Sequence, residues 1–241
     1  MKTLLSIVIW LGSIILTILL FIVVFILNLL LWPFDKLKKA THAQCFWWSD
    51  AVSALNPYWN IQVSGLENIN PKEVYVVIAN HQSLADIVVL YKTRMQFKWV
   101  AKASLFNIPF MGWCLTLIKH IKLERGDFAS IKRVYHQAAL WLRNGMSVLF
   151  FPEGTRSQTD QMNEFQNGAF KLAIKEKKPV LPICINGTRE AIPRGSWIFK
   201  DKAFVKVTVL PAISTEPFSS ADFAKLRDLV RVKIDDCLKA G

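Results

Sequence analysis

A histidine and an aspartate stand five positions apart in the segment 80–86, Asn-His-Gln-Ser-Leu-Ala-Asp, directly after an apolar run that ends at Ala79. A histidine side chain, whose ordinary pKa is about 6.5, can take a proton from a hydroxyl near neutral pH, and a carboxylate can stabilise the imidazolium that results. Residues five apart on a continuous helix point about 140° away from each other, so His81 and Asp86 meet only if the chain bends. Ser83, as the N-cap of a following helix, supplies that bend. The same residues also fit an ordinary capping pattern beside a core histidine.

A second polar cluster, residues 151–157 (Phe-Pro-Glu-Gly-Thr-Arg-Ser), also follows an apolar run. Gly154 frees the backbone, Thr155 offers a hydroxyl, and the guanidinium of Arg156 matches the geometry of a phosphate. These residues together predict a phosphate cradle. The alternative is a polar turn in which Glu153 and Arg156 form an exposed ion pair.

Two further cations follow predicted strands. Lys102 comes after Phe97–Ala101, and Arg125 comes after Ile118–Leu123. Because ligands gather beyond the carboxyl ends of parallel strands, both cations face the cleft of His81 if these strands share one sheet. Taken singly, each is more typical of a solvated surface charge.

Other chemistry finds little support. No serine or cysteine stands in a G-x-S-x-G setting, which favours direct attack by an acceptor hydroxyl over a covalent enzyme intermediate. No pair of histidines has metal-ligand spacing, so we expect no metal site. The widely separated Cys45, Cys114, Cys184 and Cys237 are interpreted as buried free thiols.

Short β-rich runs alternate with helical runs from about residue 60 onwards, which predicts an α/β domain with a mixed, largely buried β-sheet flanked by helices. The clearest helix is predicted over Ser130–Asn144, and a second helical stripe begins after Ser219. The predicted strands are Asn60–Ser64, Val74–Ala79, Phe97–Ala101, Ile118–Leu123, Ser147–Phe151, Val180–Ile185 and Phe204–Leu210.

The amino-terminal segment predicts a membrane anchor, because no charged residue occurs between Lys2 and Asp35. Such a run exceeds the length needed for the ~30 Å hydrocarbon core and is too long for a signal peptide. It forms either one membrane-anchoring helix or a helical hairpin kinked near Gly12. Three lysines follow the run and one precedes it, so the rest of the chain is expected in the cytoplasm.

These patterns divide the chain into an anchor (1–34), a juxtamembrane or interfacial segment (35–59) and an α/β domain with a carboxyl-terminal helix (60–241). The aromatic residues of the middle segment lie either along the membrane interface or on the domain core. The formal charge of +12 suits nucleic acid, anionic lipid or a phosphorylated substrate. The basic residues are dispersed and no nucleic-acid motif occurs, so we expect no nucleic-acid partner.

Taken together, the motifs resemble those of the glycerolipid acyltransferase family, specifically its 1-acylglycerol-3-phosphate acyltransferases. The resemblance covers roughly residues 60–212. The matching blocks are Asn80-His81 with Asp86; Lys102 through Ile108-Pro109 and Gly112 to Arg125; Phe151 to Ser157; and Val180-Leu181-Pro182-Ile183.

The resemblance implies roles for these residues. His81 is expected to be the general base and Asp86 its partner. The acceptor's phosphate and glycerol are expected to contact Lys102, Arg125, Glu153, Gly154, Thr155 and Arg156. Val180–Ile183 would help to shape the acyl-binding region, and the uncharged stretch Ser104–Ile118 would form core, line an acyl channel or dip into the bilayer.

The resemblance also implies the reaction. A fatty acyl group is expected to pass from acyl-CoA or acyl carrier protein to the free sn-2 hydroxyl of 1-acylglycerol-3-phosphate, giving phosphatidic acid, without a metal or a tightly held cofactor. The protein is expected in a membrane of the bacterial inner or endoplasmic-reticulum type, with the catalytic domain facing the cytoplasm. One alternative is the same chemistry on glycerol-3-phosphate, another lysophospholipid or a lyso-ornithine lipid. The other is a non-catalytic membrane lipid-binding protein.

Overall fold

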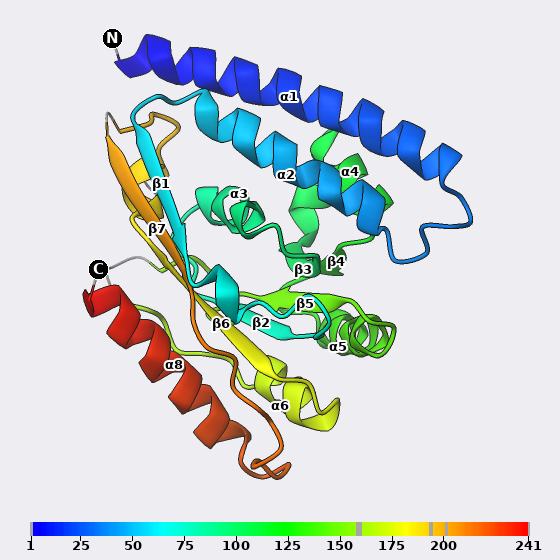
Figure 1. Ribbon diagram of the computed structural model, residues 1–241. Coiled ribbons are helices and arrows are strands. Elements are labelled where there is room, and N and C mark those ends of the chain that lie inside the picture. The colour runs from blue at the N-terminus through cyan, green and yellow to red at the C-terminus, as the bar shows by residue number, and fades with distance from the viewer. Residues whose placement is uncertain (1, 158–160, 193–194, 201, 241) are drawn as a thin grey trace.

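A seven-stranded mixed sheet forms the centre of the α/β domain (Figure 1). The structure is a computed structural model that describes residues 2–157, 161–192, 195–200 and 202–240. The strand order is β1-β7-β6-β2-β5-β3-β4. The strands are β1 (Trp59–Ser64), β2 (Val76–Ala79), β3 (Phe97–Lys102), β4 (Ile121–Leu123), β5 (Ser147–Phe150), β6 (Val180–Asn186) and β7 (Ala203–Val209).

The five strands from β6 to β4 run parallel to one another, whereas β7 pairs antiparallel to β6 and parallel to β1. Val77 at the centre of β2 aligns with Leu149 of β5 on one side and with Leu181 of β6 on the other. All three side chains are buried, as the continuous apolar runs of these strands require when helices cover both faces. The predicted mixed, largely buried sheet is confirmed.

Helices cover both faces of this sheet. One apolar core joins the sheet to α1, α2, α3 and α4, and a second joins its other face to α5, α6 and α8. Figure 1 shows α1 and α2 lying along one side of the molecule and α8 on the opposite side. The helices are α1 (Lys2–Leu30), α2 (Lys39–Ala54), α3 (Ala85–Leu90), α4 (Met111–Leu117), α5 (Phe128–Arg143), α6 (Gly168–Lys175), α7 (Thr188–Ala191) and α8 (Phe223–Ala240).

Most predicted elements lie within two residues of the observed ones, and β4 is the clearest exception. The predicted strand began at Ile118, but α4 and its terminal turn extend that far. Lys119 has a left-handed backbone (φ 62°), and the N–H of His120 donates to the carbonyl of Leu115, which closes the helix. The strand therefore begins only at Ile121. The prediction was wrong here because a β-rich composition also suits a helix end packed in a core.

Helix α1 runs without a break through Gly12 and lies against α2 and α4. A Cβ at Gly12 would stand 2.9 Å from the Cδ1 atom of Leu55, so glycine leaves room for this side chain against α1. The helix has a mean hydropathy of 3.0 over its most apolar window, and most of that window is not buried by the rest of the protein. By length and composition it is the one helix in the described residues that could cross a membrane. Of the two forms considered, the structure shows a single helix.

Helix α2 occupies most of the segment 35–59, whose aromatic residues were expected either at the membrane interface or on the domain core. Phe46, Trp47 and Trp48 are half-buried and pack against the apolar core on the α1 side of the sheet. His42, on the same helix, is fully buried among aromatic rings that include Tyr91 and Phe97. The aromatic residues of α2 therefore serve as core contacts, whereas Tyr58, later in the segment, is exposed.

Candidate active site

The carboxyl-terminal ends of the five parallel strands lie at one edge of the sheet, where open α/β sheets place their ligands. A polar side chain lies at or just after each of these ends. From the amino to the carboxyl terminus, these residues are His81 after β2, Lys102 at the end of β3, Arg125 after β4, Glu153 after β5 and Thr188 after β6.

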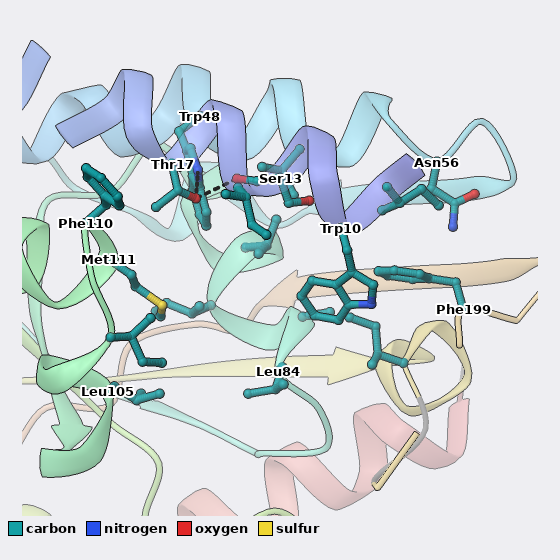
Figure 2. A pocket seen from close by; sticks show the side chains of 18 of the residues that line it. Trp10, Ser13, Thr17, Trp48, Asn56, Leu84, Leu105, Phe110, Met111 and Phe199 are labelled. Carbon is teal, nitrogen blue, oxygen red and sulfur yellow. Dashed lines mark hydrogen bonds between the residues drawn. The ribbon is translucent and has the colours of Figure 1, made fainter. Parts of the chain in front are cut away.

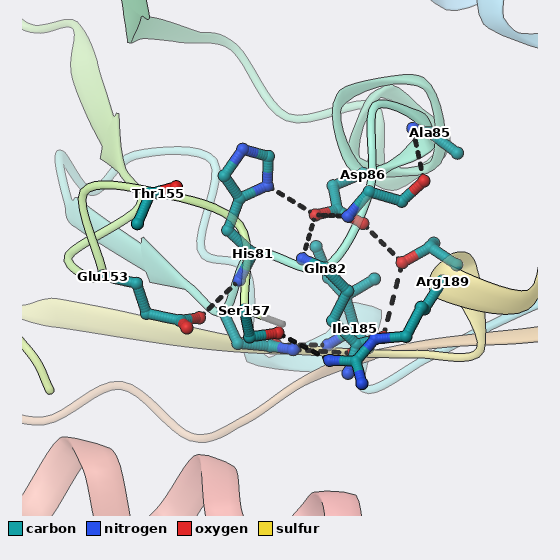
Figure 3. A network of polar contacts seen from close by, with 12 residues as sticks. His81, Gln82, Ala85, Asp86, Glu153, Thr155, Ser157, Ile185 and Arg189 are labelled. Carbon is teal, nitrogen blue, oxygen red and sulfur yellow. Dashed lines mark hydrogen bonds and ion pairs between the residues drawn. The ribbon is translucent and has the colours of Figure 1, made fainter. Parts of the chain in front are cut away.

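The His81 ring and the Asp86 carboxylate form a hydrogen-bonded pair (Figure 3). His81 Nδ1 lies 2.6 Å from Asp86 Oδ2. The same oxygen accepts the backbone N–H groups of Gln82 (2.7 Å) and Ser83 (3.0 Å), and Oδ1 accepts the hydroxyl of Thr188 (2.5 Å). A carboxylate that accepts all four bonds makes Nδ1 the protonated ring nitrogen. The lone pair of Nε2 is then available as a base.

The chain bends between His81 and Asp86, although the cap differs in detail from the predicted one. Leu84, not Ser83, occupies the N-cap position of α3, and its backbone is already helical. Ser83 still acts across the turn, because its hydroxyl accepts the N–H of Ala85 at 3.3 Å while its own N–H donates to Asp86. This exchange resembles a capping box with an aspartate in the reciprocal position. It places Asp86 in the first turn of α3, pointing back at His81.

The histidine ring borders a pocket of about 440 Å³. It stacks on Phe151, with ring centroids 4.2 Å apart, and its side chain is 21% exposed. Lys102, Arg125 and Gly154 line the same pocket. The structure thus brings the candidate base, two cations predicted to bind the acceptor and the glycine of the 151–157 turn around one space.

Two polar residues of the 151–157 turn, Thr155 and Arg156, do not line the pocket. Thr155 is exposed and Arg156 is half-buried. Gly154 has a left-handed backbone (φ 68°), and the N–H of Ser157 donates to the carbonyl of His81 at 2.9 Å. This turn therefore holds the histidine loop at its backbone, and its predicted contacts with a substrate stay a prediction.

Glu153 points away from the pocket, although the resemblance implied a contact with the acceptor. Its Oε1 accepts the N–H of His81 at 2.7 Å, and its Oε2 accepts the N–H of Asn163 at 2.8 Å. The residue is only 5% exposed, and burial raises the pKa of its carboxyl above the ordinary value even though both N–H donors oppose this. Its contacts assign it to the support of His81.

A second, apolar pocket of about 350 Å³ lies between α1, α2, α3 and the segment that leads into α4 (Figure 2). Leu105 lines both this pocket and the pocket of His81. Leu84 and Ala85, next to Asp86, also line it. Figure 2 shows Trp10, Leu84, Leu105 and Met111 around the space. The uncharged stretch Ser104–Ile118, for which three positions were open, contributes to this wall through Leu105 and Ile108–Met111.

Two residues to which sequence reasoning gave no role also contact the candidate site. The side-chain amide of Asn80 donates to the carbonyl of Ile185 and accepts its N–H, both at 2.8 Å, and so extends the pairing of β2 with β6 by one step. Thr188 contacts Asp86 from α7. Neither interaction has a local sequence signal, because the partners are more than 100 residues apart.

A separate group of buried polar residues lies on the α2 side, away from the His81 pocket. Burial lowers the pKa of His42 to about 3 and that of His120 well below its ordinary value. Burial also lowers the pKa of Lys98 to about 7. Cys45, Cys114 and Cys184 are buried and unbridged. In the described part of the chain, no three residues of the types that ligate metals come together.

Comparison with known proteins agrees with this geometry. Residues 60–186 match the model of the acyltransferase family. A 1-acyl-sn-glycerol-3-phosphate acyltransferase of Chlamydomonas reinhardtii is 37% identical over 185 residues, which are 76% of this chain and 55% of the relative. The enzyme of the same name from Pseudomonas aeruginosa is 32% identical over 178 residues, 73% of this chain and 68% of the relative.

A solved structure shows the same architecture. The 1-acyl-sn-glycerophosphate (LPA) acyltransferase PlsC of Thermotoga maritima superposes with a TM-score of 0.86 at 26% identity, covering 100% of this chain and 97% of that one. By contrast, the chain spans about half the length of its algal and plant relatives, between 45% and 55%.

Proposed function

The chain belongs to the acyltransferase family, and from that premise we propose that it transfers a fatty acyl group from a thioester donor to the sn-2 hydroxyl of 1-acylglycerol-3-phosphate, giving phosphatidic acid. The observation that carries the proposal is the His81–Asp86 pair, 2.6 Å apart, at the edge of a pocket that also holds Lys102 and Arg125. A base and two cations in one pocket suit an acceptor that has both a hydroxyl and a phosphate.

The dyad supplies the proton transfers of the reaction. Nε2 of His81 takes the proton of the acceptor hydroxyl while that oxygen attacks the carbonyl carbon of the thioester. The new C–O bond forms, the carbonyl electrons move to oxygen, and Asp86 stabilises the imidazolium. When the tetrahedral intermediate collapses, the C–S bond breaks and the thiol leaves with the proton from His81. No metal or cofactor takes part in this scheme.

The cations support the choice of acceptor. Lys102 and Arg125 lie on the pocket wall, and Arg156 belongs to the adjoining turn. A phosphate between these side chains would form charge-assisted hydrogen bonds, each stronger than a neutral one. In the proposal they hold the phosphate so that the free hydroxyl reaches His81.

The apolar pocket supports a place for an acyl chain. Its wall consists mainly of aliphatic and aromatic side chains from α1, α2 and α3, and it adjoins the His81 pocket at Leu105. An acyl chain that lies here gains about 0.8 kcal/mol for each CH₂ group removed from water.

The amino-terminal helix supports a membrane position with the catalytic domain on the cytoplasmic side. Trp32 and Phe34 are exposed just after α1, where aromatic side chains favour the headgroup region. Lys36 and Lys39 follow on the same side, whereas Lys2 alone precedes the apolar run. The positive-inside rule then places the residues after α1 in the cytoplasm. Acyl-CoA and acyl carrier protein both occur there, so both are candidate donors.

The experiment is an acyl-transfer assay with the full-length protein in detergent or vesicles. 1-Acylglycerol-3-phosphate is supplied with acyl-CoA or with acyl carrier protein, and thiol release and phosphatidic acid are both measured. We expect donor-dependent formation of phosphatidic acid. A parallel panel contains glycerol-3-phosphate, other lysophospholipids and a lyso-ornithine lipid. Faster turnover of a panel member would move the proposal to that acceptor, and an absence of thiol release with every pair would refute it.

A further inference from the structure

The segment from Gly187 to Ile192 lies directly after β6 and just beyond residues 60–186, where the match to the family ends. It forms the single turn of α7 beside the histidine loop. Thr188, the first residue of this turn, is completely buried. A threonine hydroxyl buried in this way needs a partner, and its partner here belongs to the catalytic pair.

The Thr188 hydroxyl donates to Oδ1 of Asp86 at 2.5 Å. The side-chain oxygen of Gln82 lies farther from the Thr188 hydroxyl, at 3.5 Å, so the Asp86 carboxylate is the main acceptor. Asp86 accepts its other three bonds at Oδ2, from His81 and two backbone N–H groups. Among the described residues, Thr188 is therefore the one donor to Oδ1, and it helps to fix the rotation of the carboxylate about its Cβ–Cγ bond together with the backbone N–H groups at Oδ2.

The position of Thr188 is itself well determined. Gly187 has a left-handed backbone (φ 82°), and a Cβ there would stand 1.9 Å from the carbonyl oxygen of Phe204, so only glycine fits this turn. At the other end of the segment, the carbonyl of Ile192 accepts the hydroxyl of Ser83 at 3.1 Å. Both ends of the segment are thus held, and the hydroxyl of Thr188 has little freedom to leave Asp86.

The next residue ties the same segment to the second polar turn. Arg189 donates to the hydroxyl of Ser157 at 2.7 Å (Figure 3), and the N–H of Ser157 donates to the carbonyl of His81. The segment therefore contacts the histidine loop through Thr188 and the 151–157 turn through Arg189.

We propose that Thr188 is a positioning residue of the active site, acting on His81 through Asp86. The inference deepens the proposed function and rests on it. By holding Oδ1, the hydroxyl acts with the two backbone N–H groups at Oδ2 to keep Oδ2 directed at Nδ1 of His81, and the ring then presents Nε2 to the acceptor hydroxyl. The hydroxyl also takes up part of the negative charge of the carboxylate, which moderates the attraction between Asp86 and the imidazolium.

The test compares Thr188→Val, which keeps the shape and loses the donor, with Thr188→Ser, which keeps the donor. We expect Thr188→Val to lower kcat about 10- to 100-fold with the KM for the acceptor within about twofold, and Thr188→Ser to retain most of the activity. We also expect the acidic limb of the pH–rate profile of Thr188→Val to move to higher pH. Without the hydroxyl, more negative charge faces the imidazolium. A variant with wild-type kcat, or one with reduced kcat and an unmoved limb, would overturn the inference.

A second measurement does not depend on turnover. Diethyl pyrocarbonate modifies the neutral imidazole, so the rate at which His81 is modified, followed by peptide mass spectrometry across pH, reports its protonation directly. The other charged groups around His81 are Glu153, which holds its backbone, and Lys102 and Arg125 on the pocket wall. All are common to both variants, so a difference between their midpoints comes from the Thr188 hydroxyl.

The two proposals fail in different ways. A higher midpoint in Thr188→Val than in Thr188→Ser supports the positioning role even if no acceptor in the panel is acylated, an outcome that refutes the proposed function alone. Equal midpoints in a correctly folded pair would overturn the role of Thr188 and leave the acyl-transfer proposal intact.

Discussion

The carboxylate of Glu153 accepts the backbone N–H of His81 at 2.7 Å, so the residue before the glycine of the 151–157 turn holds the candidate base through its main chain. Its second oxygen is occupied by the N–H of Asn163. With both oxygens engaged and the side chain buried, Glu153 has no atom directed at the pocket. Its importance to the reaction must therefore be exerted through the position of His81.

This arrangement predicts how Glu153→Gln will behave. The amide replaces one acceptor oxygen with a donor, which faces a backbone N–H and cannot bond to it. We expect kcat to fall about 10- to 100-fold with little change in the KM for the acceptor, measured by steady-state thiol release. If the substitution instead raises KM and leaves kcat unchanged, Glu153 contacts the substrate as the resemblance implied.

The assignment of His81 as the base makes a stronger prediction. His81→Ala removes the proton acceptor, and we expect kcat to fall by about 100-fold or more at pH 7.5 with the protein still folded and membrane-bound. His136→Ala is a matched control, because this histidine is exposed on α5. We expect it to retain wild-type activity. Substantial acyl transfer by His81→Ala would mean that another group removes the proton.

The cations of the pocket should act on acceptor binding. Arg125→Ala removes charge-assisted hydrogen bonds to a phosphate, each worth about 1.5–3 kcal/mol, so we expect KM for 1-acylglycerol-3-phosphate to rise about 10- to 100-fold. We expect the same direction for Arg156→Ala. Lys233→Ala, an exposed change of the same charge on α8, serves as the control. An unchanged dependence on acceptor concentration in Arg125→Ala would place the phosphate elsewhere.

Part of this site could be predicted from sequence, because the signals are local. The apolar runs of β2 and β5 mark buried parallel strands, and the polar residues directly after them must lie at one sheet edge. The spacing of His81 and Asp86 requires a bend if the two are to meet, and the bend itself was predicted from Ser83 as a helix cap. Which way a side chain points in an irregular turn has no such signal, so nothing in the sequence opposed the contact between Glu153 and the acceptor that the family resemblance implied.

Other features depend on contacts between distant segments. Thr188 reaches Asp86 only because β6 pairs with β2, and the pairing of strands so far apart cannot be read from either segment. For the same reason, the sequence left open whether the aromatic residues of 35–59 lie at the membrane interface or on the core, and the packing of α2 on the core emerged only from the fold. The sequence pattern therefore predicts the strands and helices and the polar residues at their ends well, but it predicts side-chain contacts between distant segments poorly.

The apolar pocket predicts a change in chain-length preference. Ser13 lies on the pocket wall, and Ser13→Phe reduces the space available to an acyl chain. We expect this variant to prefer shorter acyl donors in a competition assay with mixed chain lengths. Ile15→Phe, on the exposed side of the same helix, controls for added bulk on α1 and should keep the wild-type preference. An unaltered product distribution in Ser13→Phe would separate this pocket from the acyl chain.

Lys98 predicts a dependence of stability on pH that is independent of catalysis. The side chain is fully buried, and its ammonium donates to the carbonyl of Ile118 at 2.8 Å and lies 5.1 Å from the ring of Trp141. Burial lowers the pKa of Lys98 in the folded protein to about 7, from 10.5 when exposed. Between these two values the unfolded chain binds more protons than the folded one, so stability must rise with pH.

Lys98→Met removes this titration and keeps a similar side-chain length. We expect the melting temperature of the wild type, relative to that of the variant, to increase between pH 7 and pH 10 by about 3–6 °C per pH unit. One proton corresponds to at most about 1.4 kcal/mol per pH unit, and each kcal/mol shifts the melting temperature of a chain of this size by about 2–4 °C. Below pH 7 the two curves should run parallel, because Lys98 is then protonated in both states. Melting curves in detergent that stay parallel across the whole range would show that the buried ammonium keeps its proton, with the carbonyl of Ile118 and the Trp141 ring compensating for the lost solvation.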